Sequence, residues 1–223
     1  MSATRAARRD ATAELAAGDI LLPQTRTRET TDLSRLPEWS YGPSSPVWWG
    51  TLGFVAIEGC GFVLAIGAHL YLWQMNTSWP LSAPPPDLWP GTLMLGLLLV
   101  SLLPNWWVDR AAKRQDLRQV RIGLVIMTLF GLVPLVVRGF EFAHANVYWD
   151  QNAYGSMVWL LLGLHTLHLA TDAGDTLVLT ALMFTQHAQG KRFSDVSDNA
   201  FYWNFVVLSW LPLYALLYWA PRL

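Results

Sequence analysis

Ionisable side chains lie inside the most apolar stretches of this 223-residue chain. Four of them share one apolar run, at spacings of three, four and three residues: His165, His168, Asp172 and Asp175. At roughly 100° per residue, these side chains occupy an arc of about 80° on one face of a helix. Glu58 lies in the middle of an earlier apolar run. We interpret the set as an intramembrane polar seam that handles lipid or protons, or that fixes helix register.

Two further ionisable residues lie near the end of another apolar run. Arg138 and Glu141 are three residues apart, the spacing of an ion pair along a helix. Glu141 also begins a Glu-x-x-His pattern that ends at His144. A di-iron carboxylate bundle needs two such patterns and two further Glu residues, and only Glu58 is available in addition. We therefore predict a structural ion pair, with no metal site and no catalytic residues in this chain.

The runs that carry these residues have the length and composition of membrane-spanning helices. Hydrophobic residues make up 53% of the chain and charged residues only 14%. A bilayer core requires about 20 mostly apolar residues per helix. Five segments meet that requirement: Val47–Trp73, Leu88–Trp107, Ile122–Phe142, Ala153–Phe184 and Ala200–Trp219. We predict an all-α integral membrane bundle with connections at Asn76–Asp87, Val108–Arg121 and His187–Asn199.

The basic residues predict the orientation of this bundle. Six Arg precede the first span, five Lys or Arg separate the second and third, and Lys191 and Arg192 separate the fourth and fifth. The other two connections have no basic residue, and the C-terminal tail has only Arg222. Positive residues favour the cytoplasmic side, so we expect the N-terminus inside and the C-terminus outside. Residues 1–46 are then a polar cytoplasmic arm, and residues 47–223 the transmembrane domain.

Four motifs on these spans resemble subunit III of haem-copper oxidases. The segment from Gly53 through Glu58 looks like the Glu-bearing helix of that family. Gly163-Leu-His165-Thr-Leu-His168 resembles its G-x-H-x-x-H helix, and Glu141 resembles the Glu that precedes that helix. Tyr202-Trp203-Asn204-Phe205-Val206, continuing to Tyr214, is similar to its C-terminal helix. The motifs occur in order from about residue 47 to the end, as in short five-helix bacterial members.

The resemblance implies a subunit without redox centres in a bacterial respiratory terminal oxidase of the cytoplasmic membrane. Such a subunit packs beside catalytic subunit I, contacts other oxidase subunits and membrane lipids, and supports proton uptake. Haems and copper are expected in the partner subunits, none in this chain, and bound phospholipid is a further expectation. The sequence differs from the family at Asn204 and Val207, where His and Asp are usual, and at Asp172, where a small residue is usual.

Three other functions are consistent with parts of this pattern. The same fold could serve a quinol oxidase or a nitric oxide reductase, since electron-donor specificity lies in other subunits. A free-standing transporter is an alternative of another class, although five helices give no inverted repeat of the kind that many transporters have. A membrane metalloenzyme is a third. The net charge of −1 gives no indication of a nucleic-acid partner.

Overall fold

A computed structural model describes residues 40–81, 83–185 and 190–222 of the chain. The described part contains five long helices: α2 (Pro46–Met75), α3 (Leu88–Lys113), α4 (Leu117–Ala143), α5 (Ala153–Phe184) and α6 (Gly190–Tyr214). Short helical turns precede α2 (η1, Gly42–Ser44) and continue α6 (η2, Ala215–Trp219; η3, Ala220–Arg222). All five are long and apolar enough to cross a membrane. The prediction of an all-α bundle with five such helices is confirmed.

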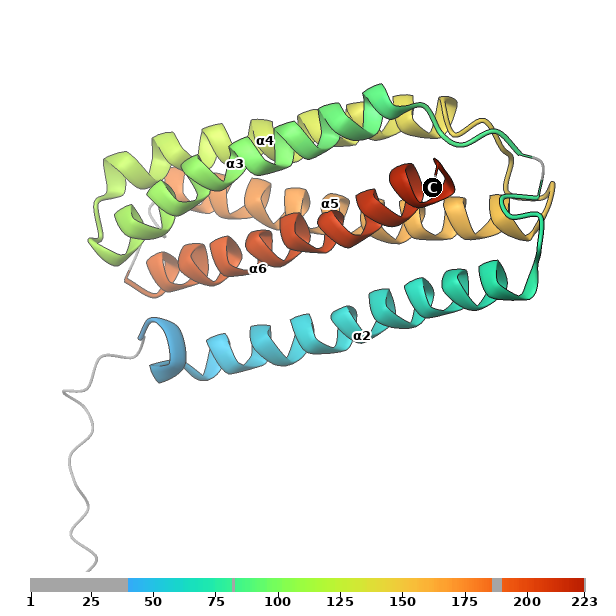
Figure 1. Cartoon of the computed structure of the whole chain (residues 1–223). Coiled ribbons are helices and arrows are strands. Elements are labelled where there is room, and N and C mark those ends of the chain that lie inside the picture. The colour runs from blue at the N-terminus through green and yellow to red at the C-terminus, as the bar shows by residue number, and fades with distance from the viewer. Residues whose placement is uncertain (1–39, 82, 186–189, 223) are drawn as a thin grey trace, which may run out of the picture. The chain divides into compact units, whose positions relative to one another are not determined.

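Four of these helices form a closed bundle, and the fifth lies along its edge (Figure 1). Helices α3, α4, α5 and α6 contact one another in a ring, whereas α2 packs against α5 and α6. Large side chains that are almost completely buried fill the ring, among them Met94, Leu161, Trp203 and Trp210. In α2 only Phe62 and His69 are buried. The interior of the protein is therefore the ring, and α2 is attached to its surface.

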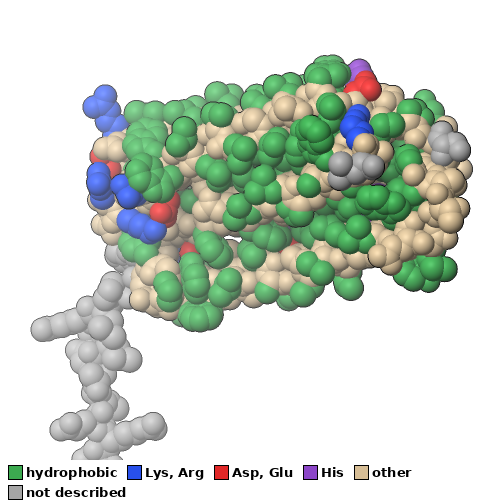
Figure 2. Space-filling model, viewed as in Figure 1, with side chains coloured by type: hydrophobic (Ala, Val, Ile, Leu, Met, Phe, Trp, Pro, Cys, Tyr) green, Lys and Arg blue, Asp and Glu red, His purple; other side chains and the backbone are tan. Residues whose placement is uncertain are grey.

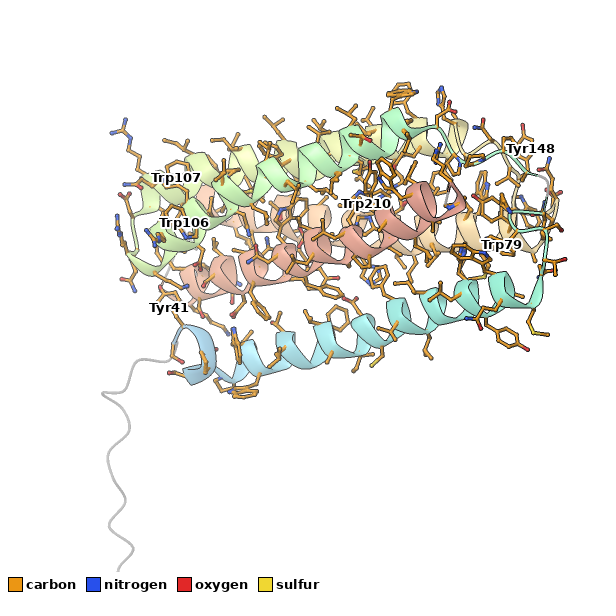
Figure 3. All side chains as sticks on the ribbon, in the orientation of Figure 1. Tyr41, Trp79, Trp106, Trp107, Tyr148 and Trp210 are labelled. Carbon is orange, nitrogen blue, oxygen red and sulfur yellow. The ribbon has the colours of Figure 1, made fainter. Side chains whose placement is uncertain are left out.

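A group of Lys and Arg side chains gathers at one end of the bundle, where the α3–α4 connection lies, while fewer charged side chains appear at the opposite end (Figure 2). We call this the basic end; it includes the start of α2, the end of α3 and the start of α4 (Figure 1). Trp106 and Trp107 lie toward this end, while Trp79 and Tyr148 lie toward the other (Figure 3). Aromatic residues at both ends of an apolar bundle are typical of proteins anchored in the two membrane interfaces.

The helices extend further than the apolar runs predict. Helix α3 continues past Trp107 to Lys113, whose ammonium lies 2.7 Å from the Asp109 carboxylate one turn earlier. Helix α4 begins at Leu117, where the Asp116 side chain accepts a hydrogen bond from the Gln119 N–H. Outside the hydrocarbon, charged side chains do not prevent a helix from continuing. The ends of α3 and α4 are therefore set by capping and ion pairs and not by the end of the apolar run.

One predicted connection is largely helical. The segment 187–199 was expected to be a polar connection, but α6 begins at Gly190 and so includes residues 190–199. Ser194, Ser197 and Asp198 are buried there against the rest of the bundle. The polarity of this segment reflects packing at the basic end of the protein rather than a loop. Of the predicted N-terminal arm, residues 1–39 lie outside the described part of the chain.

Candidate functional site: two buried polar clusters

The first polar cluster joins α2, α5 and α6 around Glu58. The Tyr202 hydroxyl donates a hydrogen bond of 2.8 Å to Glu58 Oε2. His168 Nε2 lies 3.4 Å from Glu58 Oε1. The rings of Phe62 and Phe205 pack against the imidazole of His168, with centroids 4.8 and 6.3 Å away. A carboxyl group and an imidazole are thus held together in an aromatic enclosure that keeps water away from most of their surface.

The contact of His168 Nδ1 determines whether the other ring nitrogen, Nε2, faces Glu58 with a hydrogen or with a lone pair. Its Nδ1 lies 2.6 Å from the carbonyl oxygen of Leu164. A carbonyl oxygen only accepts hydrogen bonds, so Nδ1 carries a hydrogen. Nε2 therefore presents a lone pair to Glu58 unless a second proton lies between the two groups. A hydrogen bond between His168 and Glu58 therefore requires a further proton, and whichever of the imidazole and the carboxyl group carries it is the donor.

The second cluster lies deeper in the ring and is centred on Arg138 of α4. Its guanidinium nitrogen Nη1 is 2.6 Å from Glu141 Oε2, and both side chains are almost completely buried. Glu141 Oε1 accepts a hydrogen bond of 2.8 Å from the Tyr218 hydroxyl of η2. The guanidinium also lies over the ring of Trp210, with Cζ 4.3 Å from the centroid. The buried charges are therefore compensated by an ion pair, a hydrogen bond and a cation–π contact.

His165 connects this second cluster to α5. The Nη2 group of Arg138 lies 2.6 Å from His165 Nδ1, and His165 Nε2 lies 3.0 Å from the carbonyl oxygen of Val206. Because the carbonyl accepts, Nε2 carries the hydrogen, and Nδ1 accepts from the guanidinium. His165 is thus a neutral imidazole with both nitrogens satisfied, which joins α4 to α6 across the ring.

The four predicted seam residues of α5 therefore fall in four different environments. His165 belongs to the Arg138 cluster and His168 to the Glu58 cluster. Asp172 is buried, and neither of its oxygens has a hydrogen-bond partner within the described residues. Asp175 is exposed on the outside of α5. An arc of 80° is wide enough to span from the centre of the bundle to its surface, so one helical face does not imply one site.

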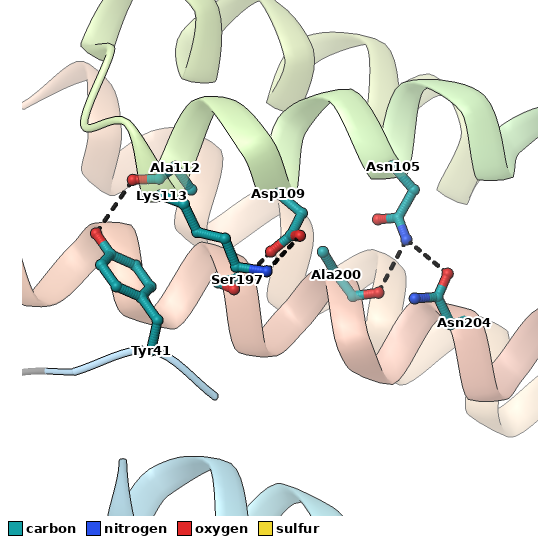
Figure 4. Close-up of polar contacts among 8 residues, drawn as sticks. All are labelled: Tyr41, Asn105, Asp109, Ala112, Lys113, Ser197, Ala200 and Asn204. Atoms are coloured by element: carbon teal, nitrogen blue, oxygen red, sulfur yellow. Dashed lines mark hydrogen bonds and ion pairs between the residues drawn. The ribbon is translucent and has the colours of Figure 1, made fainter. Parts of the chain in front are cut away.

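A third polar region lies at the basic end, around a cavity of about 410 Å³ between α3 and α6. Figure 4 shows Asp109 accepting a hydrogen bond of 2.6 Å from the Ser197 hydroxyl beside its ion pair with Lys113. Deeper in the cavity, the Asn105 amide donates to Asn204 Oδ1 at 3.0 Å and to the Ala200 carbonyl oxygen. These contacts fasten α3 to α6 along the half of the bundle that ends in the basic residues.

Tyr41 closes the same region from the segment before α2. Its hydroxyl donates a hydrogen bond of 3.1 Å to the carbonyl oxygen of Ala112 (Figure 4). Burial raises the pKa of the Tyr41 phenol above its usual range, although a hydrogen bond with Gln115 acts in the opposite direction. The phenol therefore stays protonated and remains a donor at physiological pH.

The side chains considered as metal ligands have other partners. Glu141 is bound by Arg138 and Tyr218, while His144 Nδ1 lies 2.8 Å from the carbonyl oxygen of Phe140. Within residues 40–81, 83–185 and 190–222, no three His, Cys, Asp or Glu side chains come together as a metal site would require. In the described part of the chain, Glu141 and His144 are therefore each engaged by other groups and are not joined by a third donor.

Sequence patterns indicated only part of these clusters. Tyr218 and Asn105 were not predicted, because single polar residues near span ends are common and have no diagnostic spacing. Tyr202 was noted only as part of a motif, since nothing in its spacing relates it to Glu58, 144 residues earlier. Nothing in the sequence around Glu58 indicates which helices face that carboxyl group.

The fold and the clusters define a membrane-spanning helical bundle whose ionisable groups are buried between helices. Comparison with known proteins narrows this class. A profile of the cytochrome c oxidase subunit III family matches residues 92–221, more than half of the chain. The chain belongs to the cytochrome c oxidase subunit III family.

Individual relatives support the same assignment. Cytochrome c oxidase subunit 3 of Thermostichus vulcanus is 26% identical over 176 residues, covering 78% of this chain and 87% of that protein. The protein of the same name from Drosophila melanogaster is 25% identical over 182 residues, covering 77% and 68%. That from Pongo abelii is 27% identical over 152 residues, covering 61% and 58%.

Proposed function

We propose that this chain is the subunit III of a bacterial respiratory haem-copper oxidase in the cytoplasmic membrane. In this role it packs beside catalytic subunit I, keeps that subunit active through turnover and supports its proton uptake. It has no catalytic centre of its own, and the haems and copper belong to the partner subunits. The observation that carries the proposal is the family match over α3 to α6, joined to a bundle without a metal-ligand cluster in its described part.

The Glu58 cluster supports the link to proton supply. It combines a carboxyl group that accepts a hydrogen bond from a phenol with an imidazole nitrogen 3.4 Å away, and the His168–Glu58 contact becomes a hydrogen bond only when a further proton is present. Groups of this kind are costly in hydrocarbon and are retained where they serve a function. A carboxyl group and an imidazole that face each other at this depth are suited to exchange protons with a pathway in a neighbouring subunit.

The distribution of basic residues supports the orientation. The connections rich in Lys and Arg meet at the basic end, and Arg222 lies at the opposite end, where it donates to the carbonyl oxygen of Pro86. With the basic end in the cytoplasm, α2 runs outward and the C-terminus lies outside. The Glu58 cluster is then part of the cytoplasmic half, on the side from which an oxidase takes up protons.

Purification through a tag on this chain, in mild detergent, tests the proposal. We expect a coloured complex whose optical spectrum contains haem bands and whose mass analysis identifies a large, many-helix partner. The type of haem and the oxidised donor would separate a cytochrome c oxidase from a quinol oxidase or a nitric oxide reductase. A colourless, solitary protein that transports a solute in vesicles would contradict the proposal.

A further inference from the structure

Helix α5 has a carboxylate on its outer surface at hydrocarbon depth. Asp175 is exposed, and no hydrogen bond or ion pair within the described part of the chain involves it. Met183 lies near the basic end, since its carbonyl oxygen accepts a hydrogen bond of 2.7 Å from Arg121 Nε. Asp175 precedes Met183 by eight residues, about 12 Å along a helix. An apolar core of about 30 Å that starts near Arg121 therefore contains Asp175.

The surface around Asp175 is shaped for close contact with another helix. Leu167 and Val178 are 60% and 57% exposed on the same side of α5. Between them, Gly174 has nothing within 4 Å of the position where a Cβ would lie, and Gly163 on the same side is equally open. The Thr171 hydroxyl there already donates to backbone carbonyls of its own helix. Small residues on an exposed helix face allow another transmembrane helix to approach closely.

Neither lipid nor any group in the described part of this chain satisfies the Asp175 carboxylate. Acyl chains offer no hydrogen-bond donor, and a side chain as short as Asp does not reach the headgroups from this depth. Arg121 is committed to Met183 at the basic end, and Arg138 is buried in its own cluster. A second copy of the chain docked through the same face would bring two carboxylates together, which costs free energy.

We propose that this face of α5, from Gly163 to Val178, receives a transmembrane helix of a partner subunit that presents Arg or Lys to Asp175. The proposal rests on the proposed function only in requiring that the chain belongs to a multi-subunit complex. Charge complementarity defines the occupant: the partner helix is apolar, packs closely at Gly174 and carries one basic side chain near the level of Asp175. The ion pair is then shielded from lipid by the two helices that form it.

Site-specific cross-linking in native membranes tests this surface. A photoreactive benzoylphenylalanine replaces Val178, and in a matched control it replaces Val136, which is 64% exposed on α4. We expect the probe at position 178 to cross-link a partner polypeptide at least about fivefold more than the probe at position 136, since helix contact excludes lipid. Peptide mapping should place the adduct in an apolar helix with Arg or Lys within one turn.

Variants of the carboxylate separate charge recognition from folding. We expect Asp175→Leu to lower the amount of partner retained per tagged chain by roughly tenfold or more, with the helical content of the isolated chain unchanged. Asp175→Glu, which keeps the negative charge, should restore retention. A haem-containing complex with only lipid adducts or a second copy at position 178 would overturn this inference and leave the proposed function standing. A colourless, partner-free preparation of the unaltered protein would instead refute the proposed function.

Discussion

Replacement of Glu141 by Leu should destabilise the bundle strongly, because it leaves Arg138 buried without its counter-charge. The two groups are 2.6 Å apart, and their side chains are 0% and 1% exposed. Removing one partner of such a pair typically costs about 3–5 kcal/mol. Part of that cost comes from the Tyr218 hydroxyl, which loses its acceptor. We therefore expect Glu141→Leu to lower the free energy of unfolding by about 4 kcal/mol.

The double variant Arg138→Met, Glu141→Leu isolates the electrostatic part of this loss. Two apolar side chains of similar volume remove the uncompensated charge, so most of the stability should return, to within about 2 kcal/mol of the unaltered chain. Recovery is incomplete because His165 Nδ1 and the Tyr218 hydroxyl then have no partner in the cluster. The single and double variants should therefore be strongly non-additive.

Unfolding by SDS in mixed micelles, followed by circular dichroism, measures these differences. The pair of Arg192 and Asp195 offers a matched control, because it has the same spacing and a distance of 2.9 Å, but its side chains are 38% and 22% exposed. Asp195→Asn should cost no more than about 1 kcal/mol, as is usual for surface pairs. The reasoning would be refuted by a cost below about 1 kcal/mol for Glu141→Leu. It would also be refuted by a double variant that is no more stable than Glu141→Leu alone.

Three further substitutions give distinct outcomes. Glu58→Ala should shorten the active lifetime of the purified oxidase more than it lowers the initial rate; an unaltered complex and lifetime would contradict this. Gly91→Ala would place a methyl group 2.4 Å from the ring of Tyr218, so its thermal midpoint should fall, whereas Gly96→Ala, in open space, should not change it. Asn152→Ala removes the N-cap of α5 and should cost about 1 kcal/mol in chemical unfolding, whereas Asn152→Asp should not.

The number and positions of the transmembrane helices could be predicted because membrane insertion imposes a one-dimensional rule. About 20 apolar residues in a row are needed regardless of how the helices pack, and α5 agrees with its prediction at both ends. The helix ends that carry charges could not be predicted in this way, as residues 190–199 illustrate. Hydropathy reports the solvent around a residue, and a charged helix at a membrane surface has the composition of a loop.

The site could be predicted residue by residue but not as an arrangement. The sequence indicates that Glu58, His165 and His168 must be sheltered from lipid, because isolated charges in hydrocarbon are costly. It does not indicate which helices shelter them, so His165 and His168, three residues apart, were placed in one seam although they join different clusters. Partners such as Tyr202 and Tyr218 follow from the order of helices around the ring, which spacing along the chain does not encode.

The shallow attachment of α2 has a consequence for how the protein is made. The ribosome completes α2 before α5 and α6. The two partners of Glu58, however, belong to those later helices: His168 to α5 and Tyr202 to α6. During synthesis, α2 therefore enters the bilayer with a carboxyl group that has not yet met its partners. Until the last helix arrives, that group lacks the two contacts that separate it from lipid in the finished bundle. The Glu58 cluster forms only when α2, α5 and α6 are all inserted. Its completion therefore requires that helices from both ends of the transmembrane domain are in place.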